Sequence, residues 1–175
     1  MPYFVLDKIE LGPITFYVWG AFLGLAFLIG YLLFLNQAKK QGIEENKIFW
    51  LTMVILLGSI LGARMGYVLQ FPDNFSGFFQ FNGGGLMFYG GLLGALVIGY
   101  FYIKKARLNF WQIADLVAPS LALGIFIIRL GCFLINDHQG ALTNLFWAIQ
   151  WPDGSLRHPI ALYLALNGLI MFFVF

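Results

Sequence analysis

The sequence has little charge. Only 10% of its 175 residues are Asp, Glu, Lys or Arg, whereas soluble domains carry about 25%. Hydrophobic residues make up 61% of the chain, and the mean hydropathy is +0.83. This balance excludes an ordinary soluble domain and predicts an integral membrane protein. The formal net charge of +2 is too small to indicate a nucleic-acid partner.

Cysteine and histidine are also scarce. The single cysteine, Cys132, excludes an intramolecular disulfide and any metal site built from several cysteines. It is interpreted first as a small packing residue. The two histidines, His138 and His158, and a nearby carboxylate lack the spacing typical of metal ligands. We therefore expect neither a metal ion nor a cofactor.

Five apolar segments predict an all-α fold, a polytopic membrane helical bundle that forms one transmembrane domain over residues 1–175. Each of the first four has about the ~20 residues that a bilayer crossing needs. The N-terminal residues have no basic region or cleavage pattern, so the first helix is expected to be retained. The fifth segment is still apolar at Phe175, where either the helix ends flush with the membrane or the natural protein continues. The expected helices are about 14–35, 49–69, 85–103, 116–135 and 159–175.

Lysine and arginine in the short loops predict the orientation. Residues 36–47 and 104–115 hold six of these basic residues, against one, Arg157, in the two loops on the other side. Because basic loops stay in the cytoplasm, the N-terminus is expected to face outside. Residues 145–156 contain two tryptophans and several apolar residues, which favours a position on the outer membrane surface.

Small residues recur along two of the expected helices. Gly58, Gly62 and Gly66 lie four residues apart in the second segment, and Gly90 and Gly94 in the third. Such spacing lets helix backbones approach closely in lipid. We interpret these glycines as packing residues, and the glycines at 83–85 as a turn before the third helix.

The stretch RLGCFLINDHQG, residues 129–140, carries the strongest functional signal. Arg129 stands inside an apolar segment, where a charge costs about 3 kcal/mol on insertion scales. Such residues normally face a protein interior or a water-filled cavity and have a partner. The default hypothesis is a functional anion site.

Several polar residues are expected at one depth. Arg64 lies about 15 residues into its segment and Arg129 about 13, both from the inner side. At 1.5 Å per residue, both lie roughly 20 Å from the inner boundary. The residues expected at the same outer level are Trp19, Tyr89, Asp137, His138 and His158. Together they predict a cavity that opens to the outer leaflet and holds an anionic group such as a lipid phosphate.

Each of these residues has a simpler interpretation. Either arginine could reach the outer interface with its long side chain. His158, before Pro159, could cap a helix, and Tyr89 could belong to an interfacial belt of aromatic residues. His138 could be an ordinary surface histidine.

Four blocks in order resemble the bacterial prolipoprotein diacylglyceryl transferase family. The match runs nearly end to end, and the blocks are FYVWGAFLGLAF from Phe16, GARMGYVLQF from Gly62, GGLMFYGGLLGA from Gly84, and RLGCFLINDHQG with the later RHPIALY. The resemblance implies an enzyme of the bacterial inner membrane. It would transfer the diacylglyceryl group of phosphatidylglycerol to the lipobox cysteine thiol of a preprolipoprotein and release glycerol phosphate.

The resemblance also implies site residues. The signature arginine, acidic residue and closing glycine correspond to Arg129, Asp137 and Gly140, and another arginine corresponds to Arg64. The candidate catalytic residues are Arg129, Tyr89, Asp137 and His138. The candidate lipid-binding residues are Arg64, Arg129, Tyr67, Trp19, Cys132, Gly140 and His158.

This chain departs from the family pattern at several positions. Tyr89 stands where the family usually has histidine, Trp19 where it has tyrosine, and Cys132 where it has asparagine. Asp137 and Leu164 each replace a glutamate. The family also usually continues with later helices. The alternative function is therefore a non-catalytic protein of the same fold that binds an anionic lipid or a lipoprotein precursor. A third is a small transporter or structural membrane subunit, although no inverted repeat is evident.

Overall fold

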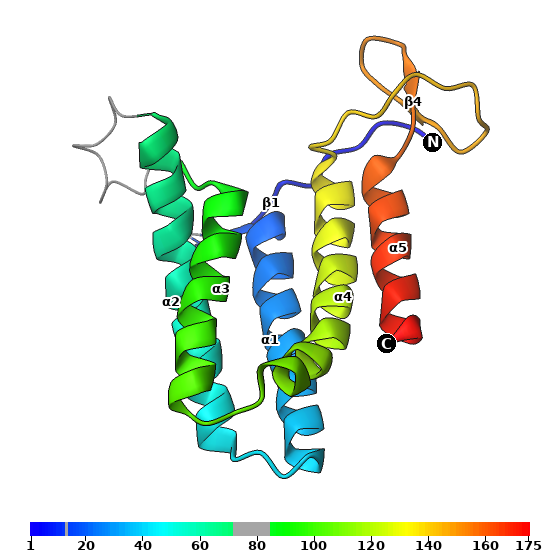
Figure 1. Cartoon of the computed structure of the whole chain (residues 1–175). Coiled ribbons are helices and arrows are strands. Elements are labelled where there is room, and N and C mark those ends of the chain that lie inside the picture. The colour runs from blue at the N-terminus through cyan, green and yellow to red at the C-terminus, as the bar shows by residue number, and fades with distance from the viewer. Residues whose placement is uncertain (13, 72–84) are drawn as a thin grey trace. The chain divides into compact units, whose positions relative to one another are not determined.

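The computed structural model describes residues 1–12, 14–71 and 85–175. In this part of the chain the fold consists of five α-helices and two small antiparallel sheets, which confirms the predicted all-α class. The helices are α1 (Val18–Lys40), α2 (Glu45–Gln70), α3 (Phe88–Lys105), α4 (Phe110–Ile135) and α5 (Ile160–Val174) (Figure 1).

The described chain divides into two compact units. The central unit is Leu35–Ala114, and the terminal unit combines Met1–Phe34 with Asp115–Phe175. Thus α2 and α3 belong to the central unit, and α5 and both sheets belong to the terminal unit. The divisions between the units fall inside α1 and α4.

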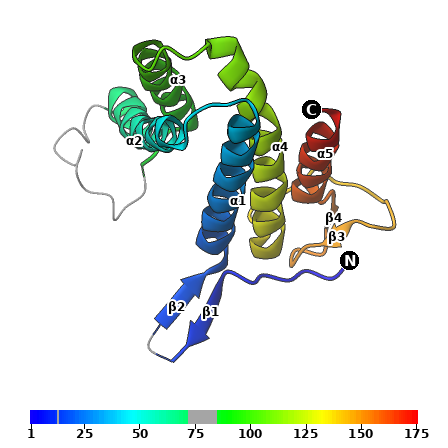
Figure 2. The same ribbon diagram turned by 90° about the horizontal axis from the view of Figure 1, so that it is seen from below.

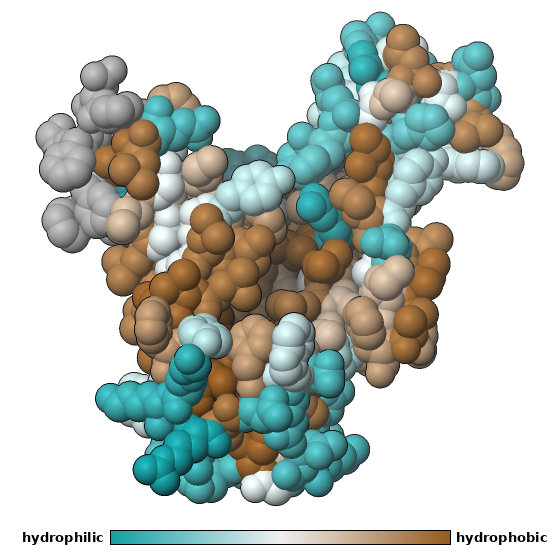
Figure 3. Space-filling view, viewed as in Figure 1, coloured by the Kyte–Doolittle hydropathy of each residue, from teal (hydrophilic) through white to brown (hydrophobic). Residues whose placement is uncertain are grey.

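Three of the described helices, α1, α2 and α4, are long and apolar enough to cross a membrane. The other two are outside this set. Helix α3 has 18 residues but ends in two lysines, and α5 has only 15 residues. Exposed apolar side chains cover much of the helical surface (Figure 3). The chain is therefore a multi-pass membrane protein. That all five helices cross, and that the N-terminus faces outside, stay predictions.

The central unit is held together by a glycine seam, which is Gly58 and Gly62 of α2 against Gly90 and Gly94 of α3. A Cβ atom added at Gly62 would lie 2.8 Å from the Gly94 Cα, and one at Gly58 would lie 2.9 Å from the Gly94 carbonyl oxygen. Backbone therefore packs on backbone, which confirms the interpretation of these residues. The two helices lie side by side in Figure 1.

Close contacts at glycine also join the helices of the terminal unit. A Cβ atom at Gly131 of α4 would lie 2.7 Å from the Phe22 Cβ of α1, and one at Gly168 of α5 would lie 2.8 Å from the Phe126 nitrogen of α4. These neighbours include side chains as well as backbone. These contacts hold α4 between α1 and α5 at Phe126 and Gly131, next to Arg129 and Cys132.

The expected start of the first helix was too early. Residues Ile14–Tyr17 form the strand β2, which pairs antiparallel with β1, Lys8–Leu11 (Figure 2). Branched and aromatic residues favour this extended conformation. The helix begins at Val18, whose amide donates to the Asp7 carbonyl oxygen at 2.9 Å. The same helix continues past the expected end at residue 35 to Lys40, because residues 36–40 include good helix formers.

The segment between α4 and α5 forms a second small sheet, β3 (Ile149–Gln150) with β4 (Leu156–Arg157). The N-terminal arm lies against this segment. The Gln150 amide donates to the Met1 carbonyl oxygen at 2.9 Å, and the Tyr3 and Trp151 rings lie 5.0 Å apart. The position of this segment on the outer membrane surface stays a prediction. The expected turn at 83 and 84 lies outside the described residues.

Candidate functional site

Arg129 lies in the last two turns of α4 and is half-buried. Among the described residues of its unit it makes no hydrogen bond or ion pair. Its guanidinium group therefore offers five N–H donors and a full positive charge inside a largely apolar helix. A site of this kind can bind an anionic group, and a planar fork is suited to a phosphate.

The end of α4 brings three further polar groups close together. Asn136 ends the helix with a positive φ of 50°, a conformation that asparagine tolerates better than most residues. The chain then turns back, and the His138 Nδ1 atom contacts an oxygen of the Asp137 carboxylate. One donor atom from each of Cys132, Asp137 and His138 lies within 4.8 Å of the other two. The sequence did not indicate this group, because Cys132 was interpreted as a packing or lipid-binding residue and the histidines lack the spacing typical of metal ligands.

The two parts of the fourth sequence block are neighbours in space. The His158 amide donates to the Ala141 carbonyl oxygen at 3.0 Å, and the Thr143 amide donates to Leu156 at 2.9 Å. A Cβ atom at Gly140 would lie 2.9 Å from the His158 carbonyl carbon. The absence of a side chain at Gly140 is therefore what allows the turn after α4 to run against the start of α5.

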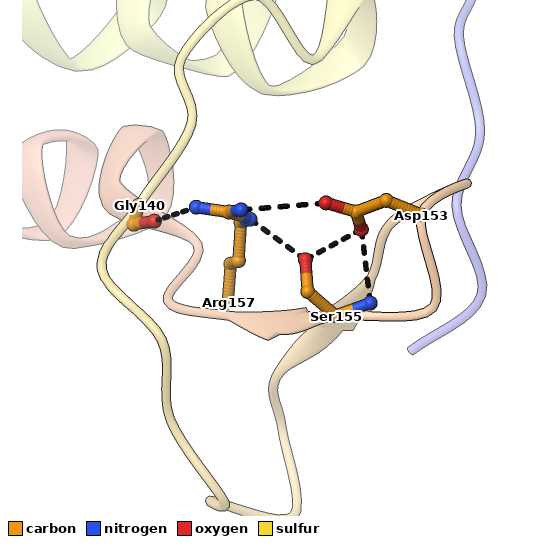
Figure 4. A network of polar contacts seen from close by, with 4 residues as sticks. All are labelled: Gly140, Asp153, Ser155 and Arg157. Atoms are coloured by element: carbon orange, nitrogen blue, oxygen red, sulfur yellow. Dashed lines mark hydrogen bonds and ion pairs between the residues drawn. The ribbon is translucent and has the colours of Figure 1, made fainter.

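Arg157 stabilises the contact between the turn after α4 and the start of α5 (Figure 4). Its guanidinium group donates to the Gly140 carbonyl oxygen at 3.3 Å, to the Ser155 hydroxyl at 2.8 Å and to the Asp153 carboxylate at 3.4 Å. Hydrogen bonds from the Ser155 hydroxyl and amide, followed by Arg157, hold the pKa of Asp153 below its ordinary value. The sequence indicated only that this arginine is the one basic residue of its loop.

A chain of hydrogen bonds orients His158. The Trp147 indole donates to the Tyr163 hydroxyl at 2.6 Å, and that hydroxyl lies 3.0 Å from His158 Nδ1. Because an indole nitrogen can only donate, the Tyr163 oxygen accepts from it and its own proton is available to Nδ1. This network favours the neutral tautomer of His158 that carries its proton on Nε2. Trp147 and Tyr163 were not among the predicted site residues.

Arg64 has a different environment in the central unit. Its side chain is buried, with 4% of its surface exposed, and its Nη1 donates to the Gly85 carbonyl oxygen at 2.9 Å. The guanidinium group also lies 5.4 Å from the centre of the Tyr67 ring. Arg64 and Tyr67 lie three residues apart on α2 and therefore share one helical face. Gly85, with a positive φ of 81°, has no room for a side chain, since a Cβ atom would lie 2.6 Å from Arg64.

The remaining two candidates are exposed aromatic residues. Tyr89 is the second residue of α3, and 68% of its surface is exposed. Trp19 is the second residue of α1, in the terminal unit, and is 41% exposed. Both positions are compatible with contact to lipid or to a bound substrate.

The predicted site residues thus fall into two groups. The terminal unit holds Trp19, Arg129, Cys132, Asp137, His138, Gly140 and His158, and the central unit holds Arg64, Tyr67 and Tyr89. Within the terminal unit, the end of α4 gathers Arg129, Cys132, Asp137 and His138. That both groups lie at one membrane depth stays a prediction.

The chain matches the family model described as prolipoprotein diacylglyceryl transferase over residues 7–175. A protein of Vibrio atlanticus named phosphatidylglycerol–prolipoprotein diacylglyceryl transferase is 35% identical over 180 residues, which cover 95% of this chain and 64% of that relative. A protein of the same name from Clostridioides difficile is 34% identical over 149 residues, covering 83% of this chain and 60% of the relative. The chain spans about two thirds of the length of such curated relatives.

Proposed function

The chain belongs to the prolipoprotein diacylglyceryl transferase family, and on that premise we propose that it transfers the diacylglyceryl group of phosphatidylglycerol. The acceptor is the thiol of a lipobox cysteine in a preprolipoprotein, and the released product is glycerol phosphate. The enzyme would act in the bacterial inner membrane. The names of the relatives, together with the apolar helices of this chain, support the substrates and the location.

The observation that carries the proposal is the unpaired state of Arg129 within the described part of its unit. The lipid phosphate carries one negative charge before transfer and gains a second as the C–O bond to the glyceryl carbon breaks. A guanidinium group fixed beside it stabilises that developing charge, most strongly where water is excluded. Arg129 is thus proposed to bind the phosphate and to stabilise the leaving group.

The acceptor thiol must lose a proton before it attacks, since the thiolate is the nucleophile. The Asp137–His138 pair is the proposed proton acceptor, because the two side chains are in contact and both are accessible at the end of α4. Tyr89 is the third candidate proton acceptor, after Asp137 and His138. In the terminal unit, Trp19, Cys132, Gly140 and His158 are proposed to contact the lipid. Lipid contact by Arg64 and Tyr67 of the central unit stays a separate prediction.

The test is transfer of a labelled diacylglyceryl group to a lipobox peptide. Arg129→Ala is expected to lower the rate about 100-fold or more, in line with the loss of a donor to a developing oxyanion. Arg129→Lys should recover only part of it, because a point charge replaces a bidentate fork. Arg107→Ala removes an exposed arginine and serves as the matched control. Full activity in Arg129→Ala would contradict the assigned role.

The assay also ranks the proton acceptors. Asp137→Asn is expected to lower the rate more than Tyr89→Phe. The opposite order would move the proton transfer to Tyr89. Binding of phosphatidylglycerol without transfer at any pH would instead favour the non-catalytic alternative. That alternative is motivated by Tyr89, which stands where the family usually has histidine.

A further inference from the structure

The end of α4 gathers a mixed set of potential metal ligands. The Cys132 side chain is buried, with 5% of its surface exposed, whereas the His138 and Asp137 side chains are 43% and 37% exposed. Sulfur therefore approaches from the protein side, and the nitrogen and oxygen donors border the open side. A catalytic zinc site has this form, with three protein ligands and a fourth position left for water or substrate.

The distances suit such an ion after small side-chain adjustments. One donor atom from each residue already lies within 4.8 Å of the other two. Zinc bonds of about 2.0–2.3 Å in tetrahedral geometry place their ligand atoms roughly 3.3–3.7 Å apart. Rotation of the two exposed side chains can reach these separations, if it opens the direct contact between the His138 imidazole and the Asp137 carboxylate and brings both closer to the sulfur.

The donor chemistry selects the metal. A thiolate, an imidazole and a carboxylate together suit zinc, which accepts sulfur, nitrogen and oxygen and imposes no geometry of its own. Calcium and magnesium require sets of oxygen ligands. Two anionic ligands balance the charge of a divalent ion, so the occupied site would be close to neutral. We propose that Cys132, Asp137 and His138 bind a zinc ion whose open position takes the acceptor thiol as a thiolate.

The binding of the acceptor thiol rests on the proposed transferase function, whereas the zinc site itself does not. With zinc bound, the Asp137 carboxylate and the His138 imidazole are ligands, so the ion replaces this pair as the group that deprotonates the acceptor. The peptide thiol releases its proton to water, because a coordinating thiol is deprotonated. The zinc-held sulfur then forms a C–S bond with the glyceryl carbon while the C–O bond to the phosphate breaks. The electron pair of that bond leaves on the phosphate oxygen, as glycerol phosphate. Arg129, three residues before Cys132, is on the same face of α4 to receive the leaving phosphate.

Cobalt reports on the metal site without any assay of activity. The full chain is purified in detergent without a polyhistidine tag, in the presence of a phosphine reductant, and titrated with Co²⁺. The expected result is a sulfur-to-cobalt charge-transfer band and intense tetrahedral d–d bands that saturate at about one ion per chain. Cys132→Ser should lose the charge-transfer band, and His138→Asn should weaken binding by more than 10-fold.

Matched controls separate these ligands from the same residue types elsewhere. His158→Asn and Asp153→Asn should keep the wild-type cobalt spectrum, since neither side chain belongs to the group at the end of α4. Helix content by circular dichroism checks that each variant is folded. A wild-type chain without a thiolate band, or a folded Cys132→Ser variant that keeps it, would overturn the metal site.

The acceptor thiol is tested on the cobalt-loaded chain. A lipobox peptide should add a second sulfur-to-cobalt band, and the same peptide with serine in place of cysteine should not. Chelation should abolish transfer, and zinc should restore it. A cobalt spectrum that ignores the cysteine peptide, or transfer by the metal-free chain, would overturn this role of the ion. Absence of transfer even in the zinc-loaded chain would reject the transferase function, while the cobalt spectra would still decide the metal site.

Discussion

The two units each contain one arginine within a long apolar helix, but the two arginines have different surroundings. Arg64 in the central unit is buried, donates to the Gly85 carbonyl oxygen and lies over the Tyr67 ring. Arg129 in the terminal unit is half-buried and bonds to no described residue of its unit. An arginine inside a membrane helix is expensive unless something compensates its charge. In the central unit that compensation comes partly from the fold, and in the terminal unit we expect it from a ligand.

Both units pack helices at glycines, but they differ in the contacts nearest to their candidate residues. The central unit joins α2 to α3 through backbone at four glycines, whereas the end of the terminal unit is held by side-chain hydrogen bonds around Arg157. Backbone contacts leave no freedom to adjust. Hydrogen-bonded side chains can rearrange when a substrate binds. This contrast suggests that the central unit is a support and that the end of α4 is the reactive part.

The largest effect is expected at the glycine seam. Gly62→Ala places a methyl group against the Gly94 backbone, so the free energy of unfolding should fall by about 2–3 kcal/mol. Gly124→Ala is the control, because a Cβ atom there meets nothing within 4 Å. It should raise stability slightly through helix propensity. Thermal loss of helix content in detergent measures both, and equal effects would contradict the rigid seam.

The two arginines should respond differently to removal. Arg64→Ala leaves the Gly85 carbonyl without this donor and removes the contact with Tyr67, so it should lower the free energy of unfolding by about 2 kcal/mol. Arg129→Ala should leave it nearly unchanged, or raise it, while activity is lost. The same thermal measurement applies. Equal destabilisation by both substitutions would mean that Arg129 is also structural.

A smaller and more local effect is expected at Gly140. Gly140→Ala pushes the turn after α4 away from the backbone of His158, which should cost about 1–2 kcal/mol. Hydrogen exchange at the His158 amide, which donates to Ala141, should become faster, while exchange in α2 stays the same. Faster exchange in both units would show that the contact is not local to the terminal unit.

The smallest effect concerns the acidity of Asp153. Its pKa in the folded protein is lowered from 3.8 by Ser155 and Arg157, so its ionised form stabilises the turn above that unfolded value. This contribution is lost as the pH falls through the lower folded pKa. Exchange of the Ser155 amide should therefore accelerate, relative to its intrinsic rate, below pH ~4. Asp153→Asn should remove the pH dependence, and a dependence that survives would assign it to another group.

Parts of the fold that depend on local sequence were predictable. Apolar runs gave the five helices, because a bilayer requires long apolar segments. The four-residue spacing of Gly58 and Gly62 indicated close packing, and the three-residue spacing of Arg64 and Tyr67 places both on one helical face. Each of these features repeats with the period of a helix and can therefore be read directly.

Other features depend on turns and on contacts distant in sequence. The hairpin before Val18 was missed because Ile14–Tyr17 continues the apolar run of the helix. The group at the end of α4 depends on the left-handed conformation of Asn136, which turns Asp137 and His138 back toward Cys132. The contact of Gly140 with His158 joins segments separated by a whole loop. Spacing along one helix contains no information about such contacts.

The glycine seam has a genetic consequence. Every change in the first or second base of a glycine codon yields a larger residue or a stop codon, and every change in the third base is silent. At Gly58, Gly62, Gly90 and Gly94 even a single added carbon meets backbone atoms of the facing helix. Almost any missense mutation at these codons should therefore be deleterious. A population of such genes should vary at these sites through synonymous changes alone, whereas the codon of Gly124 should also tolerate alanine.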